Sequence, residues 1–234
     1  MKPSRSILKR LLSGRFSLLL LTLVGMFFLV PLIPSDTAFL DDLLGVFSLV
    51  VLLSCLRSIT QNRVVFRFMV ALALLNLAAG SFELLGHTHV MAFQVAVLGI
   101  RLIYYGIVFV SIMRYVFDRT SVTVDKICGA VSAYILMGLI FAVIYSIFFI
   151  INPGSFSFPE EVPSDSLLGL WSIYYSFVTL TTLGYGDVTP VLPAAQVYSF
   201  VEAACGQLFL GILVARLVAL QILHSQAESR KEEG

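Results

Sequence analysis

The chain has 234 residues, of which 59% are hydrophobic and 12% are charged, and its mean hydropathy is +0.96. This composition excludes a soluble globular domain, because apolar runs of about 20 residues are typical of membrane spans. The net charge of +1 excludes little, and the placement of the charges along the chain is more informative.

The chain begins with a basic segment. Residues 1–15 carry five Lys or Arg side chains and no acid, which predicts a cytoplasmic leader under the positive-inside rule. A lipid-binding basic patch is a second interpretation of the same charges. A cleaved signal peptide is disfavoured, because the apolar run over 16–33 is long and Asp36 spoils a cleavage site of small residues. We therefore expect a first helix that is retained.

Six apolar spans are expected, joined by loops whose charges alternate between the two sides of the membrane. Acids follow the first span, and Arg57, Arg63 and Arg67 follow the second, which places the first loop outside and the second inside. Each basic cluster, and both termini, then fall on the cytoplasmic side. The spans are predicted at about 16–33, 40–59, 66–85, 90–114, 127–151 and 194–222.

The fourth span carries few charges. Arg101 lies near its middle and Arg114 at its cytoplasmic end, thirteen residues apart. A helix that senses voltage needs a basic residue at every third position in order to move several charges through the field. Asn76 on the third span lies at about the same depth as Arg101, so we expect a buried polar lock between them. A gating charge at Arg101 is the alternative.

The segment 152–193, between the fifth and sixth spans, is predicted to enter the membrane without crossing it. A turn at 152–154 ends the fifth helix, and after an acidic loop the residues 166–180 have the length of one short helix. Pro190 and Pro193 stop the chain soon afterwards. Backbone that is not helical is tolerated at membrane depth only where it is buried in protein or faces water.

The short helix is followed by Thr181-Thr182-Leu183-Gly184-Tyr185-Gly186-Asp187. Two glycines around a tyrosine disfavour a helix interior, where Gly costs about 1 kcal/mol relative to Ala. Glycine adopts backbone conformations that residues with a Cβ avoid. If these conformations alternate in handedness, successive carbonyl oxygens point to one side. Four such strands around an axis can replace the water around a potassium ion.

This segment resembles the K⁺ channel signature, TVGYG followed by Asp, with Leu183 where Val is usual. The resemblance implies that the backbone carbonyls of Thr182 to Tyr185 and the Thr182 hydroxyl coordinate K⁺. The Leu183 side chain is expected to pack behind the filter, so the exchange affects packing and not the type of ion. The expected ion-binding residues are Thr182, Leu183, Gly184, Tyr185 and Gly186.

Several neighbours are expected to support this filter. Tyr174 and Tyr175 stand where the family usually has a tryptophan pair, so their hydroxyls are expected to form a cuff around the filter, with plain aromatic packing as the alternative. Tyr174 is expected to bond Asp187 behind the filter. Thr179 lies on the last turn of the short helix and can bond the filter backbone. The predicted supporting residues are Thr179, Thr181, Tyr174, Tyr175, Asp187 and Glu202.

The sixth span contains one acid and two glycines of interest. Glu202 lies about eight residues into the span, where a carboxylate is costly unless it finds donors or is protonated. We expect it to face the back of the filter and the pore helix rather than the ion. Gly206 stands where K⁺ channels commonly have a hinge glycine, so Gly206 and Gly211 are candidate gating hinges. Close helix packing through a small residue is the alternative.

These features predict an all-α membrane protein of six transmembrane helices, with a re-entrant pore helix and selectivity filter between helices five and six. The resemblance to six-transmembrane, single-pore-loop K⁺ channels of prokaryotic type implies passive K⁺ conduction across the plasma or inner membrane without steep voltage gating. A homotetramer is expected, because a single filter is buried only where four chains meet. The predicted divisions are a leader at 1–15, a four-helix voltage-sensor-like domain at 16–126, a pore domain at 127–222 and a short cytoplasmic tail at 223–234.

The alternative function is a non-conducting membrane subunit that assembles with other channel chains. Both filter glycines are intact, which argues against it. The sequence has no carboxylate pair, metal cluster, nucleophile triad or phosphate loop, so we expect no enzyme, no cofactor and no nucleic-acid partner. The expected partners are K⁺, the lipid bilayer and further copies of the chain. The tail is too short for a ligand-binding module, so gating by such a module is not expected.

Overall fold

The computed structural model describes Gly14, residues 16–29, scattered residues between 67 and 78, and residues 91–118, 123–159 and 168–232. The predicted second span, Asn76 and most of the leader lie outside the described residues. Within them the chain forms α2 (Ser17–Leu29), α5 (Met91–Val116), α6 (Val124–Ile151), η2 (Pro153–Ser155), β1 (Phe156–Ser157), α7 (Leu168–Leu180), β2 (Thr189–Pro190) and α8 (Pro193–Glu232).

The prediction of a mostly helical membrane protein is confirmed. Three helices of the described chain are long and apolar enough to cross a membrane, at Met91–Val116, Val124–Ile151 and Pro193–Arg216. They coincide with the predicted fourth, fifth and sixth spans. Helix α2 lies within the predicted first span and is 13 residues long. The count of six spans stays a prediction.

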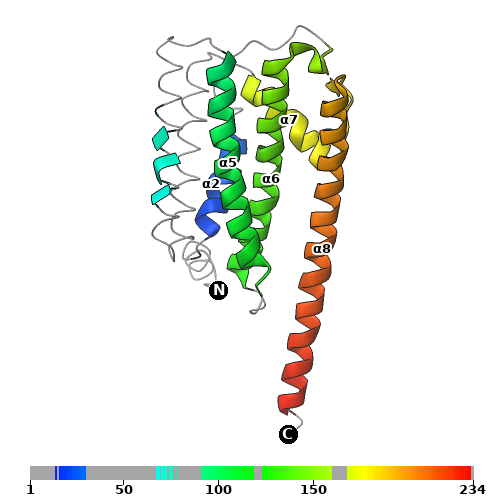
Figure 1. Ribbon diagram of the computed structural model, residues 1–234. Helices are drawn as coiled ribbons and strands as arrows, with labels where there is room; N and C mark the ends of the chain where they lie inside the picture. The colour runs from blue at the N-terminus through cyan, green and yellow to red at the C-terminus, as the bar shows by residue number, and fades with distance from the viewer. Residues whose placement is uncertain are drawn as a thin grey trace.

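Helix α6 is the centre of the described bundle. It packs against α2, α5, α7 and α8, and it is the most buried of the three long apolar helices. The short helix α7 lies between the upper parts of α6 and α8, whereas the lower part of α8 extends past the other labelled helices (Figure 1). Among the described residues, α8 accordingly keeps many large apolar side chains exposed.

Aromatic rings fix the upper end of α7 against α6. Trp171 and Tyr175 on α7 meet Phe149 and Tyr145 on α6, and Phe156 of β1 lies among them. Most of these rings meet edge to face, the arrangement that their quadrupoles favour. The packing sets the direction of α7, and with it the position of the segment that follows.

A two-stranded antiparallel sheet was not predicted. Phe156 pairs with Pro190, and Ser157 pairs with Thr189. The backbone amide of Val191 also donates to the Ser155 carbonyl at 2.8 Å. Strands of two residues show no periodicity in a sequence, so the all-α prediction omitted them. The sheet joins the loop before α7 to the chain after residues 181–187.

Helix α8 continues ten residues beyond the predicted end of the sixth span at 222. The chain from 212 to 232 has no Gly or Pro, which are the residues that most often stop a helix. Residues 223–232 of the predicted tail are accordingly helical.

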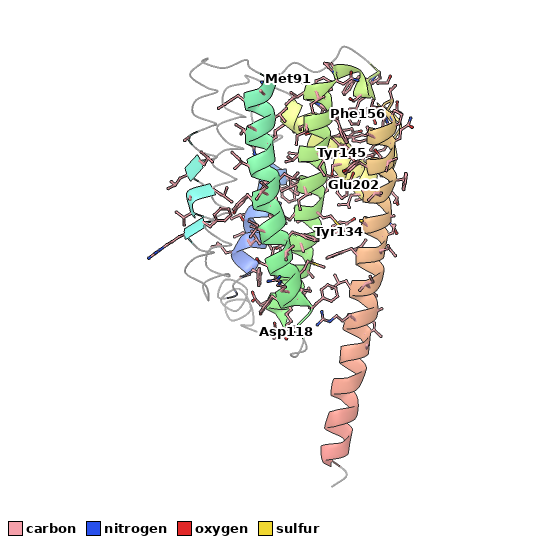
Figure 2. The ribbon with its side chains drawn as sticks, in the orientation of Figure 1. Met91, Asp118, Tyr134, Tyr145, Phe156 and Glu202 are labelled. Atoms are coloured by element: carbon pink, nitrogen blue, oxygen red, sulfur yellow. The ribbon has the colours of Figure 1, made fainter. Side chains whose placement is uncertain are left out.

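The carboxyl-terminal end of α5 and the amino-terminal end of α6 meet at the lower end of the bundle, near Asp118 (Figure 2). The Asp118 carbonyl accepts hydrogen bonds from Lys126 Nζ at 3.0 Å and from Arg216 Nη2 at 2.6 Å. The Asp125 carboxylate accepts from the backbone amide of Phe16 at 2.9 Å and from the Tyr115 hydroxyl at 3.1 Å. These bonds tie α2, α5, α6 and α8 together.

Candidate functional site

The backbone of residues 181–187 alternates in handedness. Thr182, Gly184 and Gly186 have φ angles of +58°, +59° and +78°. The residues between them, Leu183 and Tyr185, are absent from the positive-φ residues of the described chain. Alternation of this kind turns successive carbonyl oxygens toward one side of the strand. The sequence indicated the two glycines but not Thr182, whose conformation is uncommon for a residue with a Cβ.

The segment is anchored through its amides. The backbone N–H groups of Thr182 and Leu183 each donate, at 2.9 Å, to carbonyls on the last turn of α7, those of Thr179 and Val178. Gly184 N also donates to the Val178 carbonyl, at 3.3 Å. Thr179 thus bonds the backbone of this segment through its carbonyl. Among the described residues, none donates a hydrogen bond to the carbonyls of residues 182–185, which leaves those oxygens available to a cation.

The two threonines at the start of the segment differ in their bonds. The Thr181 hydroxyl donates to the Phe177 carbonyl at 2.7 Å and so continues the end of α7. The Thr182 hydroxyl donates to the Thr181 carbonyl at 2.6 Å. It also accepts from Gln207 Nε2 on α8 at 3.4 Å. Gln207 was not singled out from the sequence, because nothing in an apolar span shows which polar residue faces Thr182.

Tyr174 and Asp187 are brought together across the segment. The Tyr174 hydroxyl donates to Asp187 Oδ2 at 2.5 Å, and Val188 N donates to Oδ1 at 3.0 Å. The bond from Tyr174 holds the pKa of Asp187 below its ordinary value. The same bond raises the pKa of Tyr174 to about 12. Both groups keep the protonation states that the hydrogen bond requires at neutral pH.

Tyr175 points to a different partner from Tyr174. Its hydroxyl lies 2.7 Å from Ser199 Oγ on α8. Since the Ser199 hydroxyl donates to the Ala195 carbonyl at 2.7 Å, the hydrogen between the two hydroxyls comes from Tyr175. The two tyrosines therefore make separate contacts, Tyr174 with Asp187 and Tyr175 with Ser199 on α8.

Glu202 lies on the side of α8 that faces α6 and α7. Its side chain is fully buried. Tyr145 on α6 donates to Oε2 at 2.6 Å, and Ser176 on α7 makes a short hydrogen bond with Oε1. Figure 2 labels Tyr145 and Glu202 next to each other between the upper parts of α6 and α8. Neither hydrogen-bond partner of Glu202 was predicted from the sequence.

Comparison with known proteins bears on the last part of the chain. A family model described as "Ion channel" matches residues 130–221. "Two pore potassium channel c" of Oryza sativa subsp. japonica is 34% identical over 90 residues, which cover 37% of this chain and 17% of that protein. "Protein LctB" of Bacillus caldotenax is 33% identical over 98 residues, which cover 41% of this chain and 72% of that protein.

The chain belongs to the ion channel family, within the potassium channel superfamily. The resemblance drawn from residues 181–187 is thereby confirmed. Ion channels are not a class of enzymes, in agreement with the expectation from the sequence. No solved structure matches the chain with comparable significance. The chain spans only 17% of the length of the rice relative, and the rest of that protein lies outside the alignment.

The two candidate hinge glycines of the channel have different surroundings. A Cβ on Gly206 would lie 2.4 Å from the Leu180 carbonyl oxygen, at the end of α7, whereas a Cβ on Gly211 would meet no atom within 4 Å. Close approach of α8 to α7 therefore explains glycine at 206. A hinge at either position stays a prediction. Gly138 on α6 is similar to Gly206, since a Cβ there would lie 2.8 Å from the Phe177 ring.

The predicted polar lock of the channel is described on one side only. Arg101 lies on α5, and its Nε atom is buried with no hydrogen-bond partner in the part of the chain that the structure describes. Asn76 lies outside the described residues. The pairing of Arg101 with Asn76 stays a prediction.

Proposed function

We propose that this channel is a K⁺-selective pore formed by four copies of the chain, with residues 182–185 as the ion-binding filter. The observation that carries the proposal is the alternation of φ at Thr182, Gly184 and Gly186, together with amides that bond to α7. This leaves four successive carbonyls per chain without a protein donor among the described residues. Rings of backbone carbonyls are how K⁺ channels replace the water shell of the ion.

The exposure of the filter supports assembly around an axis. The side chains of Leu183 and Tyr185 are 55% and 66% exposed within one chain. Irregular backbone at membrane depth requires cover by protein or an aqueous pore, and each chain supplies one such segment. Large apolar side chains are also exposed along α8, where copies of the chain would pack, and they include Phe200, Leu208, Ile212 and Val214. A closed ring of four chains covers both features.

Potassium is assigned from the signature in residues 181–187 and from the name of the rice relative, which is a potassium channel. The acidic outer segment and the absence of Lys and Arg between 127 and 215 favour cations at the pore. The same proposal includes six spans, cytoplasmic termini and a place in the plasma or inner membrane. It also includes weak dependence on voltage, since α5 has only Arg101 and Arg114 as basic residues.

The test is ion flux from liposomes that contain the purified protein alone. Vesicles loaded with K⁺ are expected to release it, and vesicles loaded with Na⁺ are expected to retain it. An ionophore added at the end reports the ion content of each sample. Vesicles that hold the assembled protein and release neither ion would contradict the proposal and support the non-conducting subunit.

A further inference from the structure

We propose that Glu202 is a neutral carboxylic acid that positions the pore helix α7 by joining it to α6 and α8. The protonation is independent of the proposed function, whereas its effect on conduction rests on that function. Figure 2 shows the place of Glu202 and Tyr145 between the helices. The contacts around this carboxyl, the charges near it and its burial each support the assignment.

The number of hydrogens decides the protonation. Ser176 Oγ lies 2.7 Å from the Gly138 carbonyl and makes a second, short hydrogen bond with Glu202 Oε1. Glu202 Oε2 lies 2.6 Å from the Tyr145 hydroxyl. Oxygen pairs this close share a hydrogen. The three contacts need three hydrogens, whereas the two hydroxyls of Ser176 and Tyr145 supply one each.

The third hydrogen must come from Glu202. The carbonyl of Gly138 has no hydrogen to give, so Ser176 donates to it. The Ser176 oxygen then accepts from a protonated Glu202 Oε1, and Tyr145 donates to Oε2. Each oxygen of the carboxylic acid has one hydrogen-bond partner in this arrangement. An ionised Glu202 would leave either the contact with Ser176 or that between Ser176 and Gly138 without a hydrogen.

The charges around Glu202 favour the neutral form. No Lys, Arg or His occurs between 127 and 215, so α7, the part of α6 after Lys126 and the part of α8 before Arg216 offer no cation. Among the described residues, the titratable groups that interact with Glu202 are the hydroxyls of Tyr134 and Tyr145 on α6 and of Tyr175 on α7. The carboxyl-terminal half of α7 brings partial negative charge. A fully buried carboxylate with no counter-charge is costly, and protonation removes that cost.

The position of Ser176 gives the neutral acid its role. Ser176 lies on α7 two residues before Val178, whose carbonyl holds the amides of Leu183 and Gly184. The hydrogen bonds from Tyr145 through Glu202 to Ser176 therefore fix the last turns of α7, whose carbonyls bond the amides of the filter segment. Glu202 touches no ion-binding residue in this arrangement, so it is a positioning residue.

Infrared spectroscopy tests the protonation directly. Purified protein at neutral pH is expected to show the carbonyl band of a protonated carboxylic acid, and this band should shift when the glutamates carry ¹³C in the carboxyl group. The band should be lost in Glu202→Gln. In Glu202→Asp it should no longer respond to labelled glutamate. Asp187→Asn is the matched control and should leave the band in place, since Asp187 is ionised. A wild-type spectrum without such a band would overturn the proposal.

Conduction tests the positioning role. Glutamine offers a donor and an acceptor in the places of the two oxygens of the neutral acid, so Glu202→Gln is expected to keep K⁺ over Na⁺ selectivity in liposomes. Glu202→Ala removes both bonds and is expected to lose selectivity. Equal loss in the two variants would show that the carboxylate charge is needed and would contradict the positioning role. If wild-type protein conducts no ion, the proposed function fails, and the infrared result still decides the protonation.

Discussion

At the scale of single residues, Gly206 determines how closely α8 approaches α7. The Leu180 carbonyl oxygen lies where a Cβ would be, and this atom belongs to the backbone, which moves less easily than a side chain. Gly206→Ala is therefore expected to destabilise the assembled protein by about 1–3 kcal/mol, the usual cost of overpacking. Thermal unfolding in detergent measures the change.

Gly211→Ala is the matched control, because a Cβ at 211 meets nothing within 4 Å and alanine is the better helix former. Its stability is expected to equal or exceed that of the wild type. If Gly206→Ala has wild-type stability but a changed open probability, the hinge interpretation is right and the packing account is wrong.

The hydrogen bond between Tyr174 and Asp187 predicts a pH effect. Asp187 has a pKa below its ordinary value, so its charge is present above the ordinary carboxyl range and is lost only as the pH falls through the lowered pKa. Tyr174→Phe removes the main cause of the lowering. The midpoint at which external acid reduces K⁺ current is expected to shift to higher pH in this variant.

Recordings of K⁺ current against external pH measure that midpoint. Tyr198→Phe is the control, since Tyr198 contacts the Phe148 ring, whereas the Asp187 carboxylate is bonded by Tyr174 and Val188. It is expected to leave the midpoint unchanged. An unchanged midpoint in Tyr174→Phe would mean that the bond does not act on Asp187 in the assembled channel.

The sequence predicted part of this residue-level detail. An acid inside an apolar span needs donors, so the sequence indicated that Glu202 requires hydrogen-bond partners. Its partners Tyr145 and Ser176 stand 57 and 26 residues away, and only the packing of three helices brings them together. The positive φ of Thr182 could not be read from a residue type that rarely adopts it.

At the scale of elements, α5 predicts weak voltage dependence. Moving one charge across the membrane is worth about 2.3 kcal/mol per 100 mV. Arg101 is the one basic residue in the middle of α5, so even full transit in four subunits moves about four charges. Open probability is therefore expected to change little between about −100 and +100 mV.

Arg101→Gln tests the same point. It is expected to lower folding yield more than it shifts any conductance–voltage curve, because the Nε atom of Arg101 is buried. A steep sigmoidal curve in wild-type channels that Arg101→Gln flattens would identify α5 as a voltage sensor.

The lengths of the apolar runs predicted the existence of the long helices better than the residues at which they end. The fourth and fifth spans match α5 and α6 to within three residues at each end, because long apolar runs are strong signals. Helix α8 continues past 222, where the sixth span was predicted to end, since the sequence there loses its apolar character before it loses its helical propensity. The sheet of β1 and β2 depends on contact between segments more than 30 residues apart.

At the scale of the whole molecule, the proposed filter requires four chains. Cross-linking of the purified protein in mild detergent is expected to give a ladder that ends at four subunits of 25.8 kDa. Protein denatured before cross-linking is the control and should give monomer alone. A ladder that ends at two would require a different geometry for the pore.

The central claim is that residues 182–185 select K⁺, and a reversal potential with K⁺ on one side of the membrane and Na⁺ on the other tests it most directly. A large shift from zero is expected for the wild type and for Gly106→Ala, a helical position where a Cβ meets nothing within 4 Å. Gly184→Ala, at φ +59°, should bring the potential toward zero or prevent assembly. A wild-type potential near zero, or a Gly184→Ala channel with unchanged selectivity, would contradict the account.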